Sequence, residues 1–173
     1  MANLIPKISL DSLLKNDQST IKVLSDALEN HGFFVLTDHG ISNELFKVAY
    51  AFSEKFFALD LSKKNALSHP EKAGARGYTP FGKETALGET VPDLKEFWHH
   101  GPVIDDTYDK RIMSNVEVND LDGFDETFNQ LFKELNGLGM KLFSSISLTL
   151  DKPSNFFNSK VEKGNSLLRS IHF

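Results

Sequence analysis

The side chains that could bind a metal ion in this sequence are its six histidines, together with the carboxylates. Imidazole and carboxylate groups hold a divalent metal when several of them lie on one rigid surface. Only His69 has an acid two residues further on, Glu71, with His99 or His100 available downstream. Six histidines among 24 acids in 173 residues give roughly one such pair by chance, and Pro70 predicts a loop. We therefore expect no metal site in this chain.

The remaining histidines favour structural roles. His99 and His100 are adjacent, so on a strand they would face opposite sides and could not share one ion. We expect one of them to be packed and the other solvated. His39 lies between Asp38 and Gly40, and we expect its ring to be hydrogen-bonded locally in a turn rather than to bind a ligand.

Arg76 and Tyr78 flank Gly77 and could bind a small organic molecule. A guanidinium group can hold a carboxylate, and a phenol can donate a hydrogen bond. The alternative is that Gly77 makes a turn and that both side chains brace it. The residues alone leave both interpretations open.

Composition restricts the class of partner. The formal charge of −5 has the wrong sign for nucleic acid or anionic lipid, so a small soluble ligand is favoured. The absence of cysteine excludes disulfides and thiolate metal sites and is typical of a reducing compartment. No leader pattern and no apolar run of ~20 residues occurs, and we expect a cytoplasmic protein.

The first forty residues read as strand, helix and strand. Residues 5–10 alternate after a proline, which predicts a short edge strand. A helix is expected from Thr20, with Gly32 ending it in the left-handed conformation. Residues 33–37 are expected to form a buried strand, with Phe33 and Phe34 in the core alongside Phe56 and Phe57.

The rest of the chain contains one strongly periodic segment. Ser42 is a predicted N-cap of a second helix, residues 62–93 are rich in glycine and proline and predict a long irregular stretch, and a short strand is expected at 97–98. Residues 105–122 predict a solvated connection. From residue 122 to about residue 150, apolar residues at steps of four and three predict one long amphipathic helix, followed by a helical turn near Phe156 and a strand at 166–173.

The order and spacing of several short motifs resemble the N-terminal region of the isopenicillin N synthase-like and plant-type 2-oxoglutarate oxygenases. The motifs are Ile5-Pro6, Gly32-Phe33-Phe34, Asp38-His39-Gly40-Ile41, Phe56-Phe57, Arg76-Gly77-Tyr78, Pro92-Asp93-Leu94-Lys95-Glu96-Phe97 and Leu168-Arg169. The resemblance implies an α+β fold: the N-terminal helices and strands of a double-stranded β-helix (jelly-roll) oxygenase, including its long supporting helix, with most of the jelly roll absent. Residues 1–165 would be the N-terminal oxygenase region, and 166–173 the first strand leading into the missing jelly roll.

The function that the resemblance implies is the N-terminal part of a non-haem iron(II), 2-oxoglutarate-dependent dioxygenase that oxidises a small organic substrate. In that family a His-x-Asp pair and a distant His bind iron, and an Arg holds the far carboxylate of 2-oxoglutarate. All of these lie beyond the point that corresponds to Phe173. The chain alone would then have no catalytic residue, bind neither cofactor, and need the C-terminal catalytic half, in cis or as a separate chain.

The same resemblance implies which residues lie near the ligands. Arg76, Tyr78 and Phe97 would be near the mouth of the substrate pocket. Arg169 and Phe173 would be near the co-substrate, on the strand that enters the jelly roll. Family members often carry a Tyr at the position of Phe173, so a relative that uses iron without 2-oxoglutarate is also possible.

A different class of function is also open, namely a non-catalytic binding or interaction module that kept this scaffold. The energetics favour a missing partner. Six large apolar side chains on the long helix represent roughly 9–18 kcal/mol when buried, at ~1.5–3 kcal/mol each, and a facing surface must supply that burial.

Overall fold

The computed structural model describes residues 5–72, 74–85, 87–88 and 90–173, and its chain forms two compact units. The first unit comprises residues 1–41 and 135–164, and the second comprises residues 42–134 and 165–173. Helix α5 (Phe124–Thr149) contributes its start to the second unit and its remainder to the first. Among the residues described, none of the helices has the length and apolar character needed to cross a membrane.

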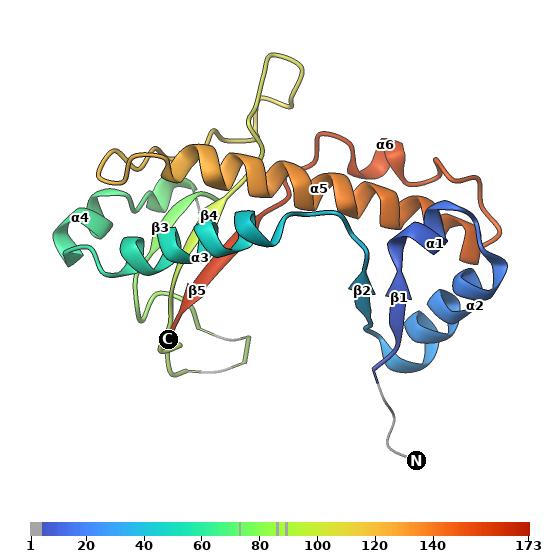
Figure 1. Ribbon diagram of the computed structural model, residues 1–173. Coiled ribbons are helices and arrows are strands. Elements are labelled where there is room, and N and C mark those ends of the chain that lie inside the picture. The colour runs from blue at the N-terminus through green and yellow to red at the C-terminus, as the bar shows by residue number, and fades with distance from the viewer. Residues whose placement is uncertain (1–4, 73, 86, 89) are drawn as a thin grey trace. The chain divides into compact units, whose positions relative to one another are not determined.

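The first unit is built around a parallel pair of strands (Figure 1). Strands β1 (Lys7–Ser9) and β2 (Val35–Thr37) pair in register Ile8 to Leu36. Parallel strands need a crossover connection, which helices α1 (Leu10–Leu14) and α2 (Gln18–Asp26) and a π-helical turn (Ala27–His31) provide. Helix α6 (Asn158–Val161) also belongs to this unit.

The core of the first unit is aliphatic. Ile8, Leu13, Leu24 and Ala27 are buried, and the partly buried residues packed against them are Ile21, Leu28, Phe34, Leu36, Leu142 and Ile146. The last two of these come from α5, so this core joins residues that are far apart in the sequence.

Most expectations for the first unit are confirmed, but the predicted buried strand at 33–37 is not, because β2 has no buried residue and Val35 is 42% exposed. Gly32 has φ of +78° and caps the π-helical turn, and the backbone N–H of Ile41 donates to the His39 ring at 3.1 Å. The prediction that Phe33 is a core residue is wrong, because its side chain is 58% exposed. The strand begins only at Val35, which leaves Phe33 in the connection before it.

The second unit is a three-stranded antiparallel sheet with helices packed on it (Figure 1). Strand β4 (Glu96–His100) is central, between β3 (Gly77–Thr79) and β5 (Leu168–His172). Trp98 lies opposite Tyr78 on one side and Ser170 on the other. The helices of this unit are α3 (Asn43–Phe57), α4 (Leu61–Ala66) and the start of α5, with a 3₁₀ turn at Pro70–Lys72.

Aromatic rings form most of the core of the second unit. Phe56 is fully buried, with its ring centroid 4.8 Å from that of Trp98 and 5.5 Å from that of Phe124. Phe124 in turn stacks on Phe128 at 4.4 Å. These contacts fasten α3 and the start of α5 to one face of the sheet.

The predicted elements of the second unit are partly confirmed. Ser42 caps α3 by accepting from the Glu44 N–H, and the long helix and the final strand are where the periodicity predicts them. The stretch at 62–93 is less irregular than expected, since it holds the end of α4 and strand β3. The connection at 105–122 is not wholly solvated, because Val116 and Val118 enter the aromatic core.

Candidate functional site

The central strand β4 has both faces covered, and this separates two sets of polar side chains. Trp98 and His100 point toward the helices, where Trp98 meets Phe124 and His100 meets Phe128. His99 points to the opposite face. Both histidines are buried, at 3% and 1% exposure, so the prediction that one of them is solvated is wrong. The alternation of a strand was interpreted correctly, but the face that carries His99 is covered by Arg169 and by the segment that contains Gly74.

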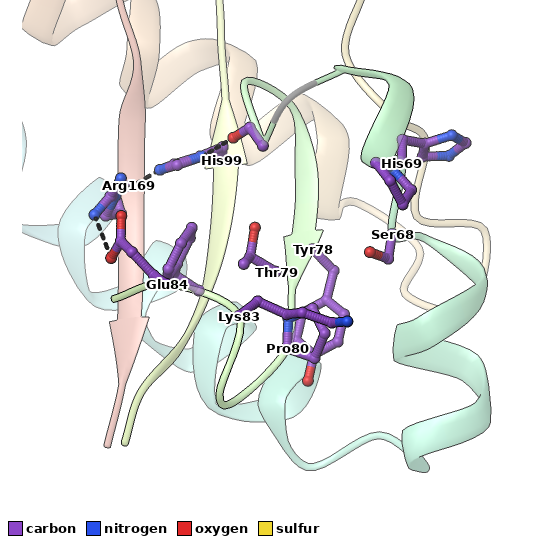
Figure 2. A pocket seen from close by; sticks show the side chains of 12 residues that line it. Ser68, His69, Tyr78, Thr79, Pro80, Lys83, Glu84, His99 and Arg169 are labelled. Carbon is purple, nitrogen blue, oxygen red and sulfur yellow. Dashed lines mark hydrogen bonds and ion pairs between the residues drawn. The ribbon is translucent and has the colours of Figure 1, made fainter. Parts of the chain in front are cut away.

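The face of the sheet away from the helices carries a pocket of about 360 Å³ (Figure 2). This volume is in the range of small-molecule sites. Its lining residues come from the segment after α4, from all three strands and from the connection after β3. They are Ser68, His69, Pro70, Gly74, Tyr78, Thr79, Pro80, Lys83, Glu84, Phe97, His99 and Arg169.

Arg169 is held in the pocket wall by two neighbours on β4. Its guanidinium carbon lies 4.3 Å from the centroid of the Phe97 ring, a cation–π geometry, and its Nε donates to Nε2 of His99 at 2.5 Å. Nδ1 of His99 bonds the Gly74 carbonyl, which can only accept, so the proton of the neutral ring is on Nδ1. Burial lowers the pKa of His99, and its neutral form is the one that can accept from Arg169.

Glu84 completes the charged side of the pocket. Its Oε2 lies 2.8 Å from Lys95 Nζ and 3.6 Å from Arg169 Nη1, and Lys95 is also 2.8 Å from Asp93. The close contact with Lys95 is the main cause that lowers the pKa of Glu84. The carboxylate is therefore ionised and already engaged by two cations.

Arg76 is placed away from the pocket lining, with a side chain that is 1% exposed. Its guanidinium donates to the carbonyls of Ala75 and Met113 and to Oδ1 of Asn165, at 2.6, 3.1 and 2.7 Å. These contacts tie Arg76 to segments far along the chain. A role of Arg76 in substrate binding stays a prediction.

Gly77, next to Arg76, adopts the conformation that the turn interpretation requires. Its φ is +82°, and a Cβ at this position would lie 2.5 Å from the Leu67 carbonyl oxygen. Both observations exclude a larger residue here without rearrangement. The following residue, Tyr78, contributes to the pocket lining, but its ring lies in the aromatic core on the helix side of the sheet, 6.0 Å from the ring of Phe56.

Tyr78 also joins a buried ionic cluster around Glu96. The phenol donates to Glu96, Lys64 donates to the same carboxylate at 2.8 and 3.0 Å, and His172 bonds it at 2.9 Å. Burial alone would raise the pKa of Glu96, but the hydrogen bonds from Lys64, Tyr78 and His172 outweigh it and lower the pKa. Burial and the bond to Glu96 raise the pKa of Tyr78, so the pair is a carboxylate with a neutral phenol.

Of the five expected ligand-proximal residues, three meet in one place. Tyr78, Phe97 and Arg169 line the pocket, whereas Arg76 and Phe173 do not. Phe173 follows β5 and is 84% exposed. Which of these residues contact a substrate or co-substrate stays a prediction.

The described residues do not fit an iron site. No group of three or more His, Asp or Glu side chains in residues 5–72, 74–85, 87–88 and 90–173 is arranged to hold a metal ion. His69 instead bonds Glu71 at 2.8 Å, and both ring nitrogens of His99 are used within the protein. No role involving iron is therefore assigned to a residue of this chain.

Sequence reasoning missed Lys83 and Glu84 as pocket residues and His99 as the partner of Arg169. Lys83 and Glu84 lie in a glycine- and proline-rich segment with no periodicity. Their position depends on how the connection between β3 and β4 folds back on itself. The backbone N–H of Asp93 donates to the Glu84 carbonyl there at 2.8 Å. The only available signal was the general one that such loops carry function more often than packing.

Comparison with known proteins identifies the scaffold. A family model described as "non-haem dioxygenase in morphine synthesis N-terminal" matches residues 5–119. Among curated proteins, the 2-oxoglutarate-dependent dioxygenase frbA of Dothideomycetidae sp. (strain 11243) is 32% identical over 83% of this chain and 45% of its own length. Gibberellin 20 oxidase 1 of Arabidopsis thaliana is 26% identical over 98% of this chain and 46% of its own length.

Solved structures agree with the sequence matches. A putative 2OG-Fe(II) oxygenase family protein from Caulobacter crescentus superposes with a TM-score of 0.86 at 33% identity, covering 98% of this chain and 56% of its own. A full-length protein of Neurospora crassa, solved in complex with alpha-KG, gives a TM-score of 0.80 at 27% identity, covering 98% of this chain and 54% of its own. The fold is thus that of the N-terminal part of these oxygenases. The chain spans about half the length of the curated relatives it matches.

Proposed function

Since the chain belongs to the non-haem dioxygenase N-terminal family, we propose that it is the N-terminal part of a non-haem iron(II), 2-oxoglutarate-dependent dioxygenase that oxidises a small organic substrate. The observation that carries this proposal is the match to oxygenase structures over 98% of the chain but only 54–56% of theirs. Iron(II) and 2-oxoglutarate would be bound by the other half and would supply the activation of dioxygen there. This chain would contribute the supporting scaffold and one wall of the substrate site.

Strand β5 supports the proposal that a second half completes the fold. The order β3-β4-β5 leaves one edge of β5 without a partner in the part of the chain that the structure describes. Ile171 and Phe173 are 45% and 84% exposed beside that edge. A free strand edge with apolar neighbours associates readily, so we expect residues 166–173 to pair with strands of the catalytic half, in cis or from a separate chain.

The pocket supports the proposed substrate role of this chain. It is a concave site of suitable size, with Phe97 and Pro80 as apolar surface and Arg169 as a fixed cation. We propose that Tyr78, Phe97 and Arg169 face the substrate. The cytoplasmic location expected from the composition stays a prediction.

A non-catalytic binding module is the second candidate, and a specific observation favours keeping it. The pocket of about 360 Å³ is concave in this chain, and its described lining residues include no metal site, so a ligand could bind here without iron. The two functions differ in their dependence on metal. A module would bind its ligand equally well with and without iron.

The test is to read the source DNA beyond the Phe173 codon and the neighbouring genes for a His-x-Asp pair, a later His and an Arg. A segment that has them would be co-produced with this chain, and the conversion of 2-oxoglutarate to succinate would be measured with and without iron(II). We expect iron-dependent turnover from the combination and none from either part. If no such segment exists, or if the combination is inactive while the lone chain binds a ligand, the module is the correct function.

A further inference from the structure

The polar groups of the pocket divide into those already paired within the protein and those still available. The Gly74 carbonyl accepts from His99, and Nε2 of His99 accepts from Arg169. Glu84 lies within ion-pair distance of Lys95 and Arg169, although its buried Oε2 accepts no hydrogen bond.

The available groups include two cations. In the described part of the chain, the exposed Lys83 has no ion pair or hydrogen bond, and the hydroxyls of Ser68 and Thr79 have no hydrogen bond. Nη1 of Arg169 is 3.6 Å from Glu84, which is longer than a hydrogen bond, so its terminal N–H groups remain free to donate. In Figure 2, Arg169 and Glu84 lie on one side of the pocket and Ser68 on the other, with Thr79 and Lys83 between them.

We propose that this pocket binds the carboxylate of a small organic acid, with Lys83 and Arg169 as its cationic partners. This inference rests on the proposed function, because it names the substrate class of that site. The two cations exceed the single negative charge of Glu84 among the lining residues, so one positive charge is left for a ligand. The ring of Phe97 and the pyrrolidine of Pro80 supply apolar surface for the body of the acid.

His99 is the positioning residue of this arrangement. Its Nδ1–H is fixed by the Gly74 carbonyl, so Nε2 presents a lone pair to the Nε–H of Arg169. Phe97 holds the plane of the same guanidinium from one side. The Nε–H of Arg169 is therefore already used, and the terminal Nη1 and Nη2 groups are the ones that can donate to a carboxylate.

The experiment compares phenylacetate with phenylacetamide, which has nearly the same shape without the charge. Binding to the full chain at pH 7.5 and low salt would be measured by NMR titration of backbone amides. We expect phenylacetate to shift the amides of Thr79 and Arg169 and to bind about tenfold or more tightly than the amide, because charge-assisted hydrogen bonds are lost with the carboxylate. Lys83→Gln should weaken phenylacetate binding about fivefold or more, whereas Lys83→Arg should retain it.

Lys110→Gln is the matched control, because Lys110 is an exposed lysine outside the pocket. It should leave the affinity unchanged, and both glutamine variants should keep the wild-type unfolding midpoint. Equal affinities for acid and amide, no effect of Lys83→Gln, shifts confined to other surfaces, or no binding of phenylacetate up to about 10 mM would each overturn the proposal. The titration needs neither iron nor 2-oxoglutarate, so its failure leaves the dioxygenase proposal standing, and the reverse also holds.

Discussion

Replacing Gly101 by alanine tests whether Arg76 is a structural residue. A Cβ at Gly101 would lie 2.1 Å from Cζ, 2.3 Å from Nη2 and 2.4 Å from Nε of Arg76, whereas non-bonded heavy atoms need about 3.5 Å or more. The guanidinium must therefore move by more than about 1 Å, which its hydrogen bonds at 2.6–3.1 Å cannot follow. Hydrogen bonds from a charged group contribute about 1.5–3 kcal/mol each, so losing two of the three costs about 3–6 kcal/mol.

The assays for Gly101→Ala are urea unfolding and thermal unfolding, both followed by fluorescence, since Trp98 is the single tryptophan and is 1% exposed. The expected loss corresponds to a thermal midpoint lower by roughly 6–24 °C for a chain of this size. Gly137→Ala is the matched control: nothing lies within 4 Å of the added Cβ, and alanine in a helix interior should stabilise by up to about 1 kcal/mol.

A double-mutant cycle isolates the cause. With Arg76→Ala the clash is absent, so adding Gly101→Ala in that background should cost less than about 1 kcal/mol. A midpoint for Gly101→Ala within about 2 °C of wild type, or an equal cost in both backgrounds, would refute the reasoning. Either result would show that the contacts of Arg76 do not stabilise the fold and would strengthen the prediction that Arg76 binds substrate.

Three further perturbations test the packing of the second unit. Lys64→Met leaves the carboxylate of Glu96 buried without its cation and should cost about 3–5 kcal/mol in urea unfolding, and an unchanged midpoint would contradict the buried pair. Ser42→Ala removes the N-cap of α3 and should cost about 1 kcal/mol, whereas Ser42→Asp should not. Burial lowers the pKa of His99 and His100 below the unfolded value of about 6.5, so the unfolded chain binds more protons than the folded chain. The free energy of unfolding should therefore fall as the pH drops below about 6.5, by up to ~1.4 kcal/mol per pH unit for each histidine. If the free energy of unfolding is the same at pH 7.5 and pH 5.5, the two histidines protonate freely in the folded chain.

Local sequence signals predicted the elements that local physics determines. The long helix follows from its apolar period, the end at Gly32 from the left-handed conformation, and the start of α3 from the Ser42 cap. Each of these depends on a few neighbouring residues. That is why they could be read before any tertiary contact was known.

The errors and omissions arise where tertiary context decides. Phe33 resembles a core residue by type, but the position where β2 begins leaves it exposed. His99 and His100 alternate as expected, but neither meets solvent, because Arg169 and Gly74 cover His99 and Phe128 covers His100. The pocket joins Lys83 and Arg169 from segments that no spacing rule connects, so its composition could not be predicted from the sequence.

Each of the two units is built from two segments that are separated in the sequence, and this affects how the chain folds during synthesis. Leu142 and Ile146 pack against the buried cluster of the first unit, which includes Ile8. The ribosome adds them about 130 residues after Ile8, roughly 7–27 s later at ~5–20 residues per second. Strand β5 likewise reaches its partner β4 only after α5 has emerged. The nascent chain therefore exposes an incomplete aliphatic core for seconds. Its yield in cells should depend on chaperones that bind apolar surfaces, and this dependence should be stronger than the stability of the folded chain would indicate.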